Sequence, residues 1–84
     1  MKIKEEMQER LEACDDKVAE LEANLKDDLK MLIIEIKDKN RGVFNLNYLR
    51  SISRRINDTC MDLGHWYLMK DVLENIAKEV NKHE

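Results

Sequence analysis

Proline is absent from this 84-residue chain, and glycine occurs only at positions 42 and 64. Because these two residue types interrupt helices and form most tight turns, their scarcity leaves few places where a helix must end. Aromatic residues make up only 5% of the chain, and no segment shows the alternation that predicts a strand. Charged residues, in contrast, reach 39%. This composition is typical of long surface helices or coiled coil and argues against a sheet protein.

Long apolar runs are also missing. The longest covers residues 31–34, far below the roughly 20 residues that span a bilayer. The first six residues, Met-Lys-Ile-Lys-Glu-Glu, lack the apolar core of a signal peptide. We therefore expect a cytoplasmic protein with no membrane partner.

Two long helical patterns lie on either side of residues 39–45, and they predict helices over about 3–38 and 46–82. Asn40 and Gly42 suit the left-handed conformation that ends a helix, and Asn45 is a suitable N-cap for the second helix. The sequence thus predicts an all-α fold in which residues 1–84 form a single domain, a long antiparallel helical hairpin. In a hairpin folded about residue 42, residue i lies near residue 84 − i.

The first helix carries a heptad pattern, with apolar residues spaced alternately four and three apart: Met7, Leu11, Cys14, Val18, Leu21 and Leu25. The next position of this series falls on Asp28, and the pattern restarts as Leu29, Leu32 and Ile36, which predicts a stutter. Beyond it the helix is apolar around most of its circumference, so we expect burial on more than one side. Met31 and Ile34 are candidates for an oligomer interface.

The second helix carries one apolar stripe before Gly64 and another after it. The first comprises Leu49, Ile52, Ile56, Cys60 and Leu63, and the second comprises Trp66, Met69, Leu73, Ile76 and Val80. The two stripes differ by about 120° around a helix, which predicts a kink or break near Gly64 or a continuous helix whose seam changes direction. A true break would produce a three-helix bundle instead of a hairpin.

A further stripe on the second helix comprises Met61, His65, Leu68 and Val72. Together with the stripes above it makes an apolar face wider than one partner helix can cover. A chain of 84 residues also leaves much apolar surface exposed when it folds alone. We therefore expect a homodimer in which two hairpins form a four-helix bundle. His65 is expected to be partly buried, and Trp66 and Tyr67 to anchor the core.

Cys14 and Cys60 are the two cysteines. In the predicted hairpin their sulfur atoms are separated by about 15 Å along the helices, too far for a disulfide. Both are expected to be small apolar residues of the helix seam. Cys60 and His65 lack a second pair of ligands at zinc-binding spacing, so no metal or cofactor is expected.

Charge is distributed unevenly along the chain. Residues 1–36 carry a net charge of −5, residues 37–55 carry +5, and residues 56–84 carry −3. The hairpin would thus have a basic turn and an acidic open end. The candidates for partner binding are Arg41, Phe44, Arg50, Arg54 and Arg55. An alternative is that Arg54 and Arg55 form ion pairs with Asp27 and Asp28 inside the hairpin.

These features predict a small homo-oligomeric protein that acts by binding another protein, as a regulator, inhibitor, adaptor or chaperone. An RNA- or DNA-binding regulator using the basic turn is the alternative, although a sequence pI of about 5.4 opposes it. In architecture alone the expected fold resembles the helical-hairpin dimers that modulate plasmid RNA. No catalytic motif is present, so neither enzymatic activity nor a small-molecule substrate is expected.

Overall fold

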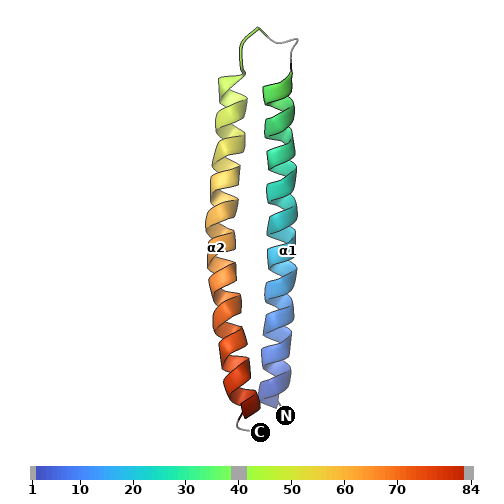
Figure 1. The fold of residues 1–84 in the computed structure, drawn as a ribbon, viewed down its shortest axis with the longest axis vertical. Coiled ribbons are helices and arrows are strands. Elements are labelled where there is room, and N and C mark those ends of the chain that lie inside the picture. The colour runs from blue at the N-terminus through green and yellow to red at the C-terminus, as the bar shows by residue number, and fades with distance from the viewer. Residues whose placement is uncertain (1, 39–41, 83–84) are drawn as a thin grey trace.

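The chain forms two long helices packed side by side in opposite directions, as Figure 1 shows. The computed structural model describes residues 2–38 and 42–82, with α1 spanning Lys2–Lys37 and α2 spanning Leu46–Lys82. The molecule measures 65 × 15 × 14 Å, and the two chain ends lie together at the end opposite the turn. No strand occurs within the described ranges. The predicted all-α hairpin is confirmed, with both helices within one residue of the expected bounds.

One continuous contact seam joins the two helices. Every seam residue is buried or half-buried, and spacings of four and three alternate without interruption on both helices. On α1 the seam comprises Met7, Leu11, Cys14, Val18, Leu21, Leu25, Asp28, Leu32 and Glu35. On α2 it comprises Leu49, Ile52, Ile56, Thr59, Leu63, Trp66, Lys70, Leu73, Ala77 and Val80.

Of the alternatives that the sequence leaves open at Gly64, the break does not occur and the continuous helix is confirmed, because α2 runs through this residue as a single helix. The three-helix alternative is therefore excluded for the described residues. The seam runs along one face of α2 through its whole length. Two of its positions are the half-buried Thr59 and Lys70, although only apolar residues had been expected in the stripes. Cys60, Met69 and Ile76, which were assigned to those stripes, are exposed. Gly64 is exposed too, so its missing side chain leaves no gap in the seam.

The stutter predicted at Asp28 is also wrong. Asp28 and Glu35 occupy the next seam positions and are 4% and 5% exposed, while the apolar Leu29 and Ile36 face outward. Buried carboxylates require compensation. For Asp28 it comes from Arg55 of α2, whose guanidinium donates a hydrogen bond to Oδ1 of the carboxylate.

The apolar core lies in the middle of the seam. Val18, Leu21 and Leu63 form its centre, and Leu25 and Trp66 pack against them. Ile52, toward the turn, is the most deeply buried side chain at 1% exposure. Cys14 is buried in the seam as expected, whereas Cys60 is exposed, and neither forms a disulfide.

The two ends of the turn differ in how well the sequence predicted them. Asn45 caps α2 as expected, since its Oδ1 accepts a hydrogen bond from the backbone N–H of Tyr48 at 3.1 Å. Gly42 does not adopt the predicted left-handed conformation. The reason is position: α1 ends at Lys37, so Gly42 lies several residues beyond the place where a helix needs such a cap. Asn40 lies outside the described residues.

Neither described helix contains a stretch that is long and apolar enough to cross a bilayer.

Candidate interaction surfaces

One apolar surface that the hairpin leaves uncovered runs along α2 and is called here the outer stripe: Met61, His65, Leu68 and Val72. At 100° per residue it lies roughly 150° around α2 from the seam. Met61 and Leu68 are 68% and 64% exposed, and Val72 is 45% exposed. The exposed Met69 and Ile76 widen the stripe on one side. All four predicted interface residues of α2 are thus brought together on one face.

His65 was expected to be partly buried, and it is exposed instead. Its ring meets that of Trp66 edge to face, with centroids 6.0 Å apart and planes at 83°. Trp66 is half-buried in the seam, whereas Tyr67 lies beside the seam and is 48% exposed. Of the two expected core anchors, only Trp66 therefore packs against the core.

The two interface candidates on α1 are not part of the outer stripe. Met31 is half-buried, and it lines a groove that also contains Asp28 and Arg55. Ile34 is 69% exposed and lies much closer to the turn than the outer stripe does. The expected burial of this segment on more than one side is therefore not provided by the single hairpin.

A second apolar surface lies at the turn and is called here the turn-end cluster: Ile36, Val43 and Phe44. These residues line a shallow cavity of about 120 Å³ together with Asp38 and Gly42. Val43 is 82% exposed and Phe44 is 51% exposed. Sequence reasoning selected Phe44 for its aromatic ring and missed Val43, which carries no charge or motif to mark it.

The basic candidates near the turn have different environments. Arg50 and Arg54 are exposed, and Arg41 lies outside the described residues. Arg55 pairs with Asp28, as the alternative of internal ion pairing predicted. Arg50 and Arg54 lie in the turns of α2 that follow the turn-end cluster in the chain, whereas Arg55 contacts Asp28 inside the hairpin.

Two further polar contacts connect the helices, and sequence reasoning missed both. Lys70 Nζ lies 2.7 Å from Oδ1 of Asp15, and this hydrogen bond and charge raise the pKa of Lys70 above its usual 10.5. The hydroxyl of Tyr67 donates a hydrogen bond to Oε2 of Glu22 at 3.3 Å. Desolvation, followed by the charge of Glu22, raises the pKa of Tyr67 above 10.0. The predicted register, in which residue i lies near residue 84 − i, places Lys70 opposite Cys14, next to Asp15, and would have indicated the first of these contacts.

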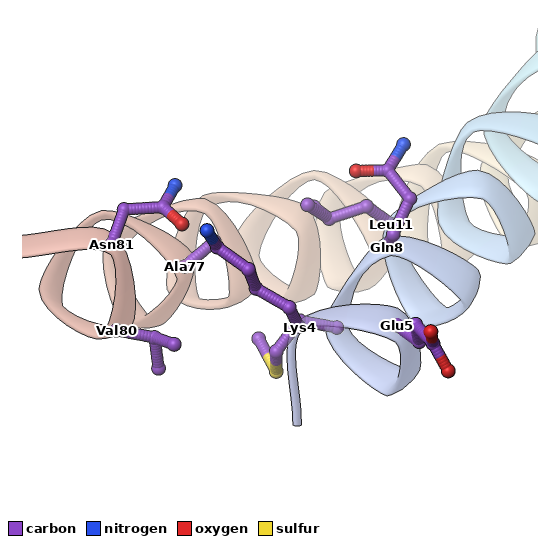
Figure 2. A pocket seen from close by; sticks show the side chains of 8 residues that line it. Lys4, Glu5, Gln8, Leu11, Ala77, Val80 and Asn81 are labelled. Atoms are coloured by element: carbon purple, nitrogen blue, oxygen red, sulfur yellow. The ribbon is translucent and has the colours of Figure 1, made fainter. Parts of the chain in front are cut away.

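Grooves between the helices occur beside the seam. At the open end, a cavity of about 270 Å³ is lined by residues including Lys4, Leu11, Ala77 and Val80. Figure 2 shows these side chains projecting from α1 and α2 around the opening. The small side chain of Ala77 at a seam position leaves this space, so the cavity is explained by packing.

Within residues 2–38 and 42–82, no group of three or more His, Cys, Asp or Glu side chains is arranged to hold a metal ion. The surfaces above offer exposed apolar side chains and exposed cations, features that macromolecular interfaces share.

Comparison of the chain with protein families, with curated proteins and with solved structures gives no match.

Proposed function

We propose that this chain is a small homo-oligomeric interaction protein, a dimer of hairpins that acts by binding another protein. The observation that carries the proposal is the number of large apolar side chains exposed at helical spacing outside the seam. Contiguous apolar surface of this kind marks interaction sites in soluble proteins. It forms two separate surfaces, the outer stripe and the turn-end cluster, which suggests two different contacts.

The outer stripe supports self-association. It repeats the four-three spacing of the seam, so another helix can pack against it in the same way. A hairpin only 15 × 14 Å in cross-section has no layer beyond α2 that could cover it. Because the outer stripe lies roughly 150° around α2 from the seam, two hairpins joined along α2 place their four helices side by side in one layer, and not in the compact four-helix bundle expected from the sequence.

The turn-end cluster supports binding of a different protein. Lys37 ends α1 and Arg50 lies in the first turns of α2, on either side of these residues in the chain, and Asp38 is in the cavity lining. An apolar centre with a basic rim fits an amphipathic segment that carries acidic side chains. A regulator, inhibitor, adaptor or chaperone would use such a contact. The proposal places the protein in the cytoplasm, where the free thiols of Cys14 and Cys60 would remain reduced.

Sedimentation equilibrium tests the assembly. We expect a dimer at about 10 µM protein, which lies above a dissociation constant of about 1 µM, or roughly 8 kcal/mol of association free energy. Leu68→Glu places a charge in the outer stripe and should produce a helical monomer at that concentration. Ala19→Glu, at an exposed position of α1, is the matched control and should remain dimeric. A wild-type monomer at this concentration would refute the homo-oligomeric part of the proposal.

Nucleic acid is the alternative ligand for the basic turn, supported by the net charge of +5 on residues 37–55. The dependence of affinity on salt concentration distinguishes nucleic-acid binding from protein binding. Affinity for nucleic acid falls steeply with salt because counterions are released, whereas an apolar protein contact changes little. Titration of labelled single-stranded and duplex RNA and DNA at two salt concentrations decides between them. Tight binding with a steep salt dependence would favour the alternative.

A further inference from the structure

The spacing and the charges along the outer stripe indicate how two copies of the hairpin would be arranged. We propose that α2 packs antiparallel against α2 of a second copy, with Met61 opposite the partner's Val72 and His65 opposite the partner's Leu68. The two-fold axis then passes between residues 66 and 67. This arrangement rests on the proposed homodimer and specifies its direction and register.

Spacing provides the first argument. The outer stripe extends by the same four-three pattern to Arg54 and Asp58 on one side and to Asn75 and Glu79 on the other. In the proposed register every member of this series faces another member. Met61, Leu68 and Val72 then form apolar layers on both sides of the axis.

Charge provides the second argument, and it selects the antiparallel direction. Arg54 lies at one end of the series and Glu79 at the other, and both are exposed. Antiparallel packing places Arg54 opposite the partner's Glu79, and two-fold symmetry repeats this pair at the other end. Parallel packing would instead place Arg54, Asp58 and Glu79 each opposite their own copy, and like charges facing each other are unfavourable.

Glu79 already contacts Lys82 one turn away, with its Oε1 3.9 Å from Nζ. Its side chain nevertheless remains 65% exposed, so a second cation can approach it. Antiparallel packing also brings the first turns of α2, which carry Arg50, Arg54 and Arg55, toward residues 71–82 of the other copy, whose net charge is −1.

The axis position agrees with the length of α2. Residues 66 and 67 lie close to the middle of Leu46–Lys82, so the two helices overlap along most of their length. On one flank of the stripe Gly64 has no side chain, and no atom lies within 4 Å of the Cβ that it lacks. On the other flank Met69 and Ile76 add apolar surface. The two helices can therefore approach closely beside Gly64.

Heterotypic cross-linking tests direction and register together. In a background of Cys14→Ala and Cys60→Ser, Met61→Cys and Val72→Cys are made as separate proteins. Both positions are exposed in the hairpin, so circular dichroism should show unchanged helicity. We expect a disulfide-linked dimer when the two proteins are mixed and oxidised, identified by its heterotypic mass. Neither variant alone should cross-link efficiently, because identical residues would be offset by about 16 Å along the axis.

The other outcomes overturn the arrangement in distinguishable ways. Efficient cross-linking of Met61→Cys alone would indicate parallel packing. A dimer by sedimentation that forms no heterotypic cross-link would refute this register while leaving the proposed assembly intact. A monomer by sedimentation would refute both the proposed dimer and its register.

Charge reversal provides an independent test on the uncross-linked protein. Arg54→Glu and Glu79→Arg should each raise the dimer dissociation constant by about threefold to tenfold, since exposed ion pairs contribute little individually. The double variant restores the opposite charges and should return the constant to near the wild-type value. Additive weakening in the double variant would show that these side chains do not face each other.

Discussion

Asp28 of α1 and Arg55 of α2 form an ion pair in which Arg55 compensates the buried charge of Asp28. A carboxylate at a coiled-coil seam position costs free energy unless a cation or donor compensates it. Here the side chain of Asp28 is 6% exposed and that of Arg55 is 59% exposed, so the pair is buried on one side only. Removing Asp28 and removing Arg55 should therefore change the free energy of unfolding by different amounts, and this difference can be measured.

We predict that Arg55→Leu lowers the free energy of unfolding by about 1–3 kcal/mol, because it leaves a buried carboxylate without its cation. Asp28→Leu should be neutral or stabilising, because a leucine at this position continues the heptad and the exposed guanidinium returns to water. Urea unfolding of both variants is the measurement. Lys30→Leu, which changes an exposed position of α1 outside both the seam and the outer stripe, should alter stability by less than about 0.5 kcal/mol. Equal losses for Arg55→Leu and Asp28→Leu would contradict this account.

Tyr67 and Lys70 respond to pH in the same direction. For both groups folding raises the pKa, so the folded state holds the proton more tightly. Their contribution to stability is complete below the ordinary pKa values of 10.0 and 10.5 and is lost as the pH rises through the raised values. The hairpin should therefore lose stability in alkali, above about pH 10.

The hydroxyl of Tyr67 can be followed directly by tyrosinate absorbance in a Tyr48→Phe background. Glu22→Gln should lower the pKa of Tyr67 toward 10.0 without reaching it, since desolvation is the larger cause and remains. Glu9→Gln removes an exposed carboxylate elsewhere on α1 and should leave the pKa unchanged. A titration curve that is identical in all three proteins would show that Glu22 does not act on the hydroxyl.

Each helix is longer than its own propensity explains, and the seam supplies the remaining stabilisation. α2 contains a glycine and several β-branched residues, yet it continues for 37 residues because α1 packs along it. At Gly64 the backbone is helical and an added Cβ would contact nothing. The glycine therefore weakens α2 without serving the packing of the hairpin.

Gly64→Ala should accordingly raise the free energy of unfolding by up to about 1 kcal/mol, because alanine is the stronger helix former. The midpoint of urea unfolding measures this, at a concentration where the Leu68→Glu background keeps the protein monomeric. Gly64→Val is a useful comparison, since its β-branched side chain has a lower helix propensity and should give a smaller gain. A loss of stability in Gly64→Ala would mean that α2 requires the flexibility of glycine there.

The two exposed apolar surfaces lie at different places along the length of the hairpin. The outer stripe is central on α2, and the turn-end cluster is at one extremity. In the proposed antiparallel dimer the two turns point in opposite directions, so both turn-end clusters remain accessible. Self-association and partner binding are then compatible and should be separable by mutation.

We predict that Phe44→Ser combined with Arg50→Ala abolishes capture of the native partner and leaves the dimer intact. Both side chains are exposed, so the fold should not change. The measurement is affinity capture from the native host by the wild type and the variant, followed by mass spectrometry, with sedimentation of both proteins. Lys26→Ala on α1 is a matched control that removes a cation away from the turn. Partners retained equally by all three proteins would place the binding site elsewhere.

Both helices, their bounds, the cap at Asn45 and the first half of the α1 seam were predictable from the sequence, because each depends on local spacing and local hydrogen bonds. The residues from Met7 to Leu25 offer one apolar stripe, so there was only one way to interpret them. The four outer-stripe residues were also predictable as a group, since they share a helix face. Their exposure in the single hairpin was also expected, because the apolar face of α2 is wider than one partner helix can cover; only the partial burial expected for His65 is wrong.

Only the tertiary structure decided which of the overlapping stripes of α2 would face α1. The sequence favours Cys60, Met69 and Ile76 by hydrophobicity, yet Thr59, Lys70 and Ala77 are in the seam. The reason is that a seam must stay in register over the whole length of two helices, so continuity outweighs the apolar character of single positions. Contacts between residues far apart in sequence, such as Arg55 with Asp28 and Lys70 with Asp15, then stabilise the polar groups that this continuity brings into or beside the seam.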